Sequence, residues 1–105
     1  MSVKKGIRKL SPNPLASRSI LLVDVREPHE FAQAHIPGAV NAPLSTFDPG
    51  AIAPQPGQTV VFSCRSGVRT LKAIAASRAA GFAYDAHFPG SMLEWTAAGE
   101  AVETG

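Results

Sequence analysis

The sequence predicts an α/β fold in which helices cover a central, mostly parallel sheet. Two short apolar runs, at residues 20–25 and 59–63, have the composition of strands that are buried on both faces of a sheet. Each run is followed by a segment with helical spacing, and this alternation is typical of layered α/β domains with right-handed crossovers. A chain of 105 residues is sized for one domain with a modest core.

The first half of the chain gives a strand, a short helix and a second strand. After the strand at 20–25, Pro28 is suited to the first turn of a helix, which we expect to end near Ala34. The Pro37-Gly38 pair predicts a turn into a short strand at 39–42. Residues 45–58 are rich in proline and glycine, so we expect a loop there with at most one helical turn.

The second half repeats the alternation. The strand at 59–63 leads to a helix over residues 68–80, which Gly81 is placed to terminate. Residues 84–88 form a weaker strand candidate. Ser91 is followed three residues later by Glu94, and this pattern predicts a capping box at the start of a final helix. We expect Trp95 to pack this helix against the core.

Composition and charge exclude several classes of protein. The chain is 45% hydrophobic and 17% charged, which is ordinary for a globular domain, and no apolar run approaches the ~18 residues of a membrane span. Five basic residues precede Asp24, the first acid: Lys4, Lys5, Arg8, Lys9 and Arg18. The segment has no aromatic residue, so we expect a solvated, partly ordered basic arm at 1–19 that binds neither nucleic acid nor membrane, and a single domain at 20–105.

The chain has one cysteine and three histidines, and these residues show no zinc-ligand spacing. We therefore expect neither a metal nor another cofactor. A single cysteine cannot form an internal disulfide, which fits a reducing compartment and a cytoplasmic location. His35 lies in a Pro-Gly turn, where a hydrogen bond to nearby backbone is the commoner role for a polar side chain than catalysis.

The single cysteine, Cys64, falls where the strand at 59–63 ends and shortly before the next helix begins. The loop between them contains Gly67 and the arginines at 65 and 69. Converging backbone N–H groups, the positive end of a helix dipole and guanidinium groups all favour the thiolate, which is the nucleophilic form. A lone cysteine is most often a small buried hydrophobe, but such a residue needs no flanking arginines. We therefore interpret Cys64 as reactive.

This loop resembles the active-site loop of rhodanese-like sulfurtransferases. Three further segments match the family in order, so the resemblance covers about residues 20–100: residues 21–28, residues 35–39, and residues 90–99 around Trp95. It implies a three-layer rhodanese-like domain in which Cys64 carries a persulfide. It also implies a binding loop and supporting residues: Arg65, Ser66, Gly67, Val68, Arg69 and Thr70 in the loop, with Asp24 and Arg26 in support. In the family pattern Asp24 would anchor Arg65.

The resemblance implies a sulfurtransferase that takes a sulfane sulfur from thiosulfate, a persulfide or a protein persulfide and passes it to a thiol or cyanide. Two alternatives stay open. A non-catalytic rhodanese-like binding module would normally lack the cysteine. A cysteine-dependent phosphatase has five residues between its cysteine and arginine, whereas Cys64 and Arg69 are separated by four. The sequence does not fix the oligomeric state.

Overall fold

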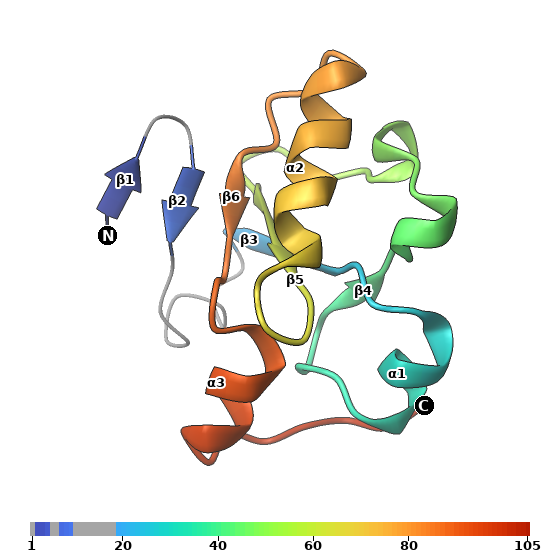
Figure 1. Cartoon of the computed structure of the whole chain (residues 1–105), viewed down its shortest axis with the longest axis vertical. Coiled ribbons are helices and arrows are strands. Elements are labelled where there is room, and N and C mark those ends of the chain that lie inside the picture. Colours follow the sequence, from blue (N-terminus) through green and yellow to red (C-terminus); the bar gives the residue numbers. More distant parts are fainter. Residues whose placement is uncertain (1, 5–6, 10–18) are drawn as a thin grey trace.

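The computed structural model describes residues 2–4, 7–9 and 19–105, the first two ranges by their backbone alone. One sheet runs through the molecule in the order β1-β2-β6-β5-β3-β4. Four of its strands fall within residues 19–105 and lie parallel to one another: β3 (Ile20–Asp24), β4 (Val40–Asn41), β5 (Thr59–Ser63) and β6 (Ala86–His87). The predicted parallel α/β sheet is therefore confirmed (Figure 1).

Both faces of the sheet are covered, because successive side chains along a buried strand point to opposite sides. On one face Leu22 and Val61 pack with Trp95 of α3 (Ser91–Ala97). On the other face Phe62 packs with Ile74 of α2 (Arg69–Ala79). The result is the three-layer arrangement that the resemblance implies, and the core position expected of Trp95 is confirmed.

The short helix α1 (Pro28–Gln33) begins at Pro28 as predicted. Its first turn is closed by Glu30, whose carboxylate accepts a hydrogen bond from the Glu27 N–H at 3.0 Å. The C-terminal segment returns to this helix, where His35 and Glu103 exchange two backbone hydrogen bonds of 2.8 and 2.9 Å. The indole N–H of Trp95 donates to the Ala101 carbonyl, which holds the start of that segment.

Two local expectations are wrong. Segment 45–58 contributes to two 3₁₀ turns rather than at most one, η2 (Leu44–Thr46) and η3 (Pro49–Ala51), because the Asp48 side chain accepts the Gly50 N–H and so caps the second turn. The capping box at Ser91 does not form. Ser91 has a φ of +49° and its side chain turns into the core instead of toward the helix.

The N-terminal segment adds two short strands to the sheet. β1 (Ser2–Lys4) and β2 (Ile7–Lys9) pair with each other in antiparallel fashion, and β2 lies parallel to β6. The expected basic arm at 1–19 falls mostly outside the described residues, so the arm and the domain boundary at 20 stay predictions. Within the part of the chain that the structure describes, no helix has both the length and the apolarity needed to cross a bilayer.

Candidate active site

Parallel pairing brings the segments after three strands to one edge of the sheet. Asp24 at the end of β3 is in register with Ser63 of β5, and Phe62 of β5 is in register with His87 of β6. Cys64 follows Ser63 directly, so it lies where the chain leaves the carboxyl edge of the sheet and turns toward α2 (Figure 1). Ligands bind at this edge in parallel α/β folds.

The loop after Cys64 curls so that its backbone amides face the sulfur. The Gly67 N–H donates to Cys64 Sγ at 3.1 Å. Burial raises the pKa of the Cys64 thiol, but hydrogen bonding from the amides of residues 70, 67, 66 and 69 outweighs it, and the pKa lies below its ordinary value. Only 1% of the Cys64 surface is exposed, so a reactant has to reach the sulfur through the mouth of the loop.

Gly67 is required at its position for two reasons. Its φ of +92° is a left-handed conformation that favours glycine, and a Cβ atom there would lie 2.2 Å from the Pro89 carbonyl oxygen. The loop therefore lies directly against the segment that precedes α3. This close approach fixes the distance between Cys64 and the start of that helix.

The start of α3 forms the floor of the loop. The N–H groups of Met92 and Leu93 donate to the carbonyls of Cys64 and Arg65, each at 3.1 Å. Ser91 is fully buried, and its Oγ accepts the Cys64 N–H at 2.9 Å, donates to the Phe88 carbonyl at 2.8 Å and lies 3.9 Å from Sγ. These contacts hold both the backbone and the sulfur of Cys64 in place.

A second hydrogen-bonded chain supports the loop from the side of α2. The Thr70 hydroxyl donates to the Gly67 carbonyl at 2.8 Å, and Nδ1 of the buried His87 lies 2.8 Å from the same hydroxyl oxygen. A hydroxyl has one proton, and Thr70 uses it on Gly67, so His87 is the donor to Thr70 through Nδ1–H. These two hydrogen bonds link His87 of β6, through Thr70, to Gly67 in the loop.

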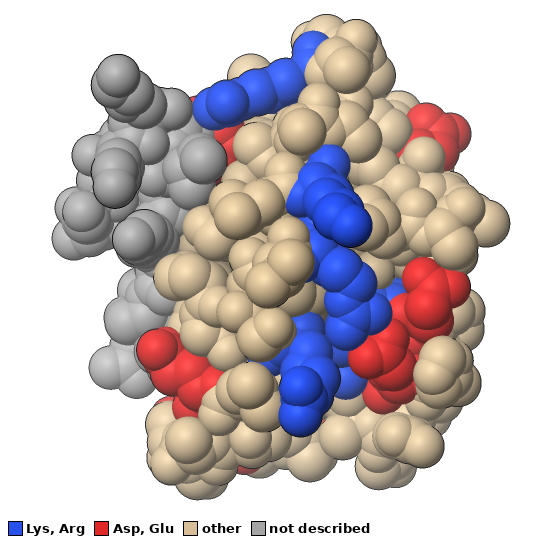
Figure 2. All heavy atoms as spheres, in the orientation of Figure 1, with Lys and Arg blue, Asp and Glu red and all other residues tan. Residues whose placement is uncertain are grey.

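The two loop arginines have different surroundings. Arg69 forms a bidentate ion pair with Glu30 of α1, at 2.7 and 3.0 Å. The Arg69 side chain lowers the pKa of Glu30 to about 2, and the carboxylate in turn raises the pKa of Arg69. Arg65 is exposed and makes no ion pair with any described residue. Figure 2 shows the basic side chains as a stripe over the loop and α2.

The implied pairing of Asp24 with Arg65 is wrong. Asp24 instead binds Arg26, which donates to both carboxylate oxygens at 2.8 to 3.1 Å, and both residues are buried. Arg26 also donates to the Ala34 carbonyl at 2.7 Å. Asp24 prefers Arg26 because the turn after β3 places that guanidinium beside it, so the pair supports α1 rather than the Cys64 loop.

The histidine in the Pro-Gly turn has contacts of a structural kind. The His35 ring stacks on Phe31 at a centroid distance of 3.8 Å, and Nδ1 lies 2.8 Å from the Phe31 carbonyl oxygen. Its Nε2 lies 3.6 Å from a carboxylate oxygen of Glu103. Among residues 19–105, no group of three or more metal-ligating side chains comes together.

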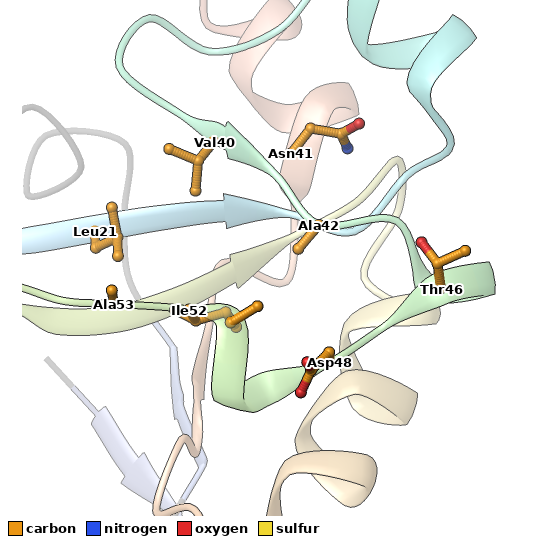
Figure 3. A pocket seen from close by; sticks show the side chains of 9 residues that line it. Leu21, Val40, Asn41, Ala42, Thr46, Asp48, Ile52 and Ala53 are labelled. Atoms are coloured by element: carbon orange, nitrogen blue, oxygen red, sulfur yellow. The ribbon is translucent and has the colours of Figure 1, made fainter.

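A separate hollow of about 370 Å³ lies beside the edge strand β4 (Figure 3). Its lining comes from β3, β4 and the 3₁₀ turns, and it includes no residue of the Cys64 loop. The two amide and carboxylate side chains in the lining already have partners: Asn41 donates to the Asp24 and Arg26 carbonyls, and Asp48 accepts from Gly50. The lining thus offers little polar chemistry.

Ser91 and Glu30 are among the residues that shape the site without having been predicted to do so. The Ser91-to-Glu94 spacing predicts a helix cap, and no local pattern indicates that the Ser91 hydroxyl instead contacts the Cys64 N–H and the Phe88 carbonyl. Glu30 gave no signal as a partner of Arg69, because the two residues lie on different helices and only the folded sheet brings them together.

The decisive comparison is with known families. A model of the rhodanese-like domain matches residues 9–98, most of the chain. The chain belongs to the rhodanese-like family. Its loop of amides around Cys64 is therefore the loop of a rhodanese-like domain, at the carboxyl edge of the family's parallel sheet.

Individual relatives and structures agree with the rhodanese-like assignment. The chain is 40% identical to protein slr1261 of Synechocystis over 77% of its own length and 45% of that protein. It is 31% identical to the thiosulfate:glutathione sulfurtransferase of Saccharomyces cerevisiae over 92% of its length and 75% of the relative. A thiosulfate sulfurtransferase structure from Pseudomonas aeruginosa superposes with a TM-score of 0.78 at 22% identity, over 94% of this chain and 20% of that chain. The rhodanese-like chain thus spans less than half of some relatives.

Proposed function

We propose that this rhodanese-like protein is a sulfurtransferase that carries sulfane sulfur as a persulfide on Cys64. The observation that carries the proposal is the Gly67 amide, which donates to Sγ at 3.1 Å within a loop whose other amides also lower the thiol pKa. Such a set of donors stabilises an anion on sulfur both before and after loading.

The reaction consists of two displacements. In the first, the Cys64 thiolate attacks the sulfane sulfur of thiosulfate, the sulfur–sulfur bond of the donor breaks, and sulfite leaves with the bonding electron pair. In the second, an acceptor thiolate or cyanide attacks the outer sulfur of the persulfide. The bond to Sγ then breaks, and its electron pair returns to Cys64 as the thiolate. No external oxidant or reductant is needed.

The substrates are proposed from the chemistry of the loop and from the relatives. Thiosulfate or a persulfide, including a protein persulfide, is the donor, and a thiol or cyanide is the acceptor. The name of the yeast relative, a thiosulfate:glutathione sulfurtransferase, supports thiosulfate as the class of donor and a thiol as the class of acceptor. We keep the cytoplasm as the proposed location because a reduced thiol is needed, although another relative is named as mitochondrial.

Phosphatase chemistry is disfavoured by two features of the loop. Cys64 and Arg69 are separated by one residue fewer than that chemistry needs, and the Arg69 guanidinium is engaged by Glu30. A non-catalytic binding module has no need for a thiol with a lowered pKa. Both alternatives are outcomes of the test below.

The test compares the native protein with Cys64→Ser. After incubation with thiosulfate, we expect the native protein to gain the mass of one sulfur atom, which a thiol or cyanide removes, while Cys64→Ser gains none. The loading rate should rise with pH to a plateau, because the thiolate is the attacking form. The midpoint of this rise should lie below pH ~8.5, the pKa of an ordinary cysteine thiol. Matching circular dichroism spectra would show that the variant is folded.

Three results would contradict the proposal. Full sulfur transfer by Cys64→Ser would place the chemistry elsewhere. Absence of loading from thiosulfate, 3-mercaptopyruvate and a protein persulfide alike would favour the binding module. Hydrolysis of an aryl phosphate faster than any sulfur transfer would favour the phosphatase.

A further inference from the structure

The mouth of the Cys64 loop has a surface that a small donor does not require. We define the loop rim as Arg65, Val68, Leu71, Lys72 and Leu93, all of which are exposed. Val68, Leu71 and Leu93 have exposed fractions of 62%, 48% and 47%, and they account for three of the five exposed large hydrophobic residues in the described part of the chain. Single exposed apolar residues are ordinary, but a group of them around a reactive atom marks a binding surface.

The loop rim combines residues of the Cys64 loop with residues of two helices. Leu71 and Lys72 lie one turn beyond Val68 at the start of α2, so these three side chains are neighbours on the helix surface. On the other side of the loop, the Leu93 N–H donates to the Arg65 carbonyl at 3.1 Å, which brings α3 against the loop. The loop rim therefore places both apolar and basic exposed side chains on the loop around Cys64 and on the two helices next to it.

The charge of the loop rim is not neutralised within the described residues. Arg26 is paired with Asp24 and Arg69 with Glu30, whereas Arg65 and Lys72 make no ion pair with any residue from 19 to 105. Figure 2 shows the basic side chains, paired and unpaired alike, as a stripe over the loop and α2, with acidic side chains beside the stripe. An acidic partner is therefore attracted to this face.

We propose that the loop rim docks an acidic protein segment that presents a cysteine thiol flanked by apolar residues. This inference rests on the proposed function, and it adds a macromolecular sulfur acceptor. The acceptor thiolate attacks the outer sulfur of the Cys64 persulfide, the bond to Sγ breaks, and the acceptor leaves as a persulfide while Cys64 regains its thiolate. The apolar flanks cover Val68, Leu71 and Leu93, and the acidic groups lie against Arg65 and Lys72.

A protein segment fits the loop rim better than a small thiol does. Leu71 and Lys72 lie on α2 beyond the loop itself, so an acceptor that covers both of them has to extend past the loop. Cys64 is only 1% exposed, and an acceptor whose thiol must enter the loop gains from contacts that hold it over the mouth.

The experiment measures the acceptor step alone. The full-length protein is loaded with thiosulfate, excess donor is removed, and the loaded protein is mixed with an acceptor. The probe is a synthetic peptide with one cysteine flanked by leucine and glutamate residues. Matched peptides carry lysine for glutamate or serine for leucine, and glutathione serves as the small acceptor. Each protein variant is compared with the native protein on the same peptide, so differences in thiol pKa among peptides cancel.

Two variants, Lys72→Gln and Leu71→Ser, distinguish the contribution of charge to docking from that of apolar contact. Neither changes a residue of the Cys64 loop. Lys72→Gln should slow transfer to the glutamate peptide about threefold, as expected for one exposed ion pair, and leave transfer to glutathione unchanged. Its matched control is Arg78→Gln at the other end of α2, which should change neither rate. Leu71→Ser should slow transfer to peptides with leucine about fivefold, whereas Val102→Ser, at another exposed apolar position, should not.

The outcomes distinguish this inference from the function on which it rests. Selective loss with Lys72→Gln and Leu71→Ser, together with weakening of the glutamate-peptide rate by salt, supports docking. If sulfur reaches glutathione normally while all peptide rates are insensitive to these changes, the docking inference is wrong and the sulfurtransferase proposal stands. If no donor loads the protein with sulfur, both the docking inference and the sulfurtransferase proposal are wrong.

Discussion

Ser91 holds a conformation that few side chains adopt, and its hydroxyl lies 3.9 Å from the sulfur of Cys64. Its φ of +49° costs energy for a residue with a Cβ atom, so the surrounding structure has to compensate for it. The compensation is visible in the two hydrogen bonds of its hydroxyl group, to the Cys64 N–H and the Phe88 carbonyl. Backbone strain is thus found where the loop must be held most firmly.

We predict that Ser91→Ala lowers the free energy of unfolding by about 2 kcal/mol, because the buried Cys64 N–H loses its acceptor while the strained φ is kept. Ser91→Gly removes the same hydroxyl but relieves the strain, so its cost should be smaller, about 1 kcal/mol. Urea unfolding of the three proteins measures both differences.

Ser77→Ala is the matched control for this prediction. Ser77 is as fully buried as Ser91, but its hydroxyl donates to the Ala73 carbonyl within α2, so its loss leaves no buried donor without an acceptor. Alanine also favours the helix, and the change should stay within about 0.5 kcal/mol. A Ser91→Ala cost no larger than that of Ser77→Ala would refute the role given to Ser91.

Between elements, one ion pair joins the helix before β4 to the helix that follows the Cys64 loop. Glu30 of α1 holds Arg69 in the first turn of α2, and the same carboxylate accepts the Glu27 N–H that starts α1. The pair therefore orders two helix N-termini at once. It also commits Arg69 to a structural contact, whereas Arg65 makes no ion pair with any residue from 19 to 105.

We predict that Glu30→Gln destabilises the fold by about 1 to 2 kcal/mol near neutral pH, less than the pKa shift alone would give, because 24% of the Glu30 side chain is exposed. Since folding lowers the pKa of Glu30 from 4.5 to about 2, the native advantage is complete above pH 4.5 and shrinks as the pH falls toward 2.

Urea unfolding of both proteins at several pH values tests this dependence. Glu100→Gln, a change at an exposed carboxylate, serves as the control for the loss of one negative charge. A difference between native and Glu30→Gln proteins that stays constant from neutral to acid pH would contradict the ion-pair account.

At the same scale, the sequence predicted most elements because their signals are local. β5 has the predicted limits, since its β-branched run is buried on both faces, and α2 differs by one residue at each end. The partners of Ser91, Glu30 and Asp24 were missed because each is set by how separate segments meet. No local pattern distinguishes a serine that caps its own helix from one that turns its hydroxyl toward a neighbouring strand end.

Across the whole molecule, the chain closes on itself around the sheet. The segment after α3 runs back to α1, where the Gly105 N–H donates to the Ala32 carbonyl at 2.8 Å and Glu103 pairs with His35 (Figure 1). The layer that carries Ser91 is thereby linked to the helix that carries Glu30. Two elements that support the loop from different sides are held by one short segment.

We predict that deleting residues 101–105 lowers the free energy of unfolding by about 2 kcal/mol, because the backbone of His35 and the indole of Trp95 lose their partners. Thermal or urea unfolding measures the loss. Glu103→Gln, which changes only an exposed side chain and keeps the backbone pairing, should remain close to the native protein. Equal stability of the shortened and full chains would show that this segment does not brace the fold.

The dependence of the Cys64 loop on α3 has a consequence for protein synthesis. The acceptor for the Cys64 N–H belongs to Ser91, so a nascent chain that ends before that residue lacks the floor of the loop around Cys64. The pairing of Ile20 with Thr59 is also distant along the chain, and contacts of this kind form late compared with local ones. The cysteine of an unfinished chain therefore keeps the ordinary acidity of an exposed thiol and is largely protonated near neutral pH. The amide contacts that lower the pKa of the Cys64 thiol thus exist only once translation has supplied α3 and the chain has folded.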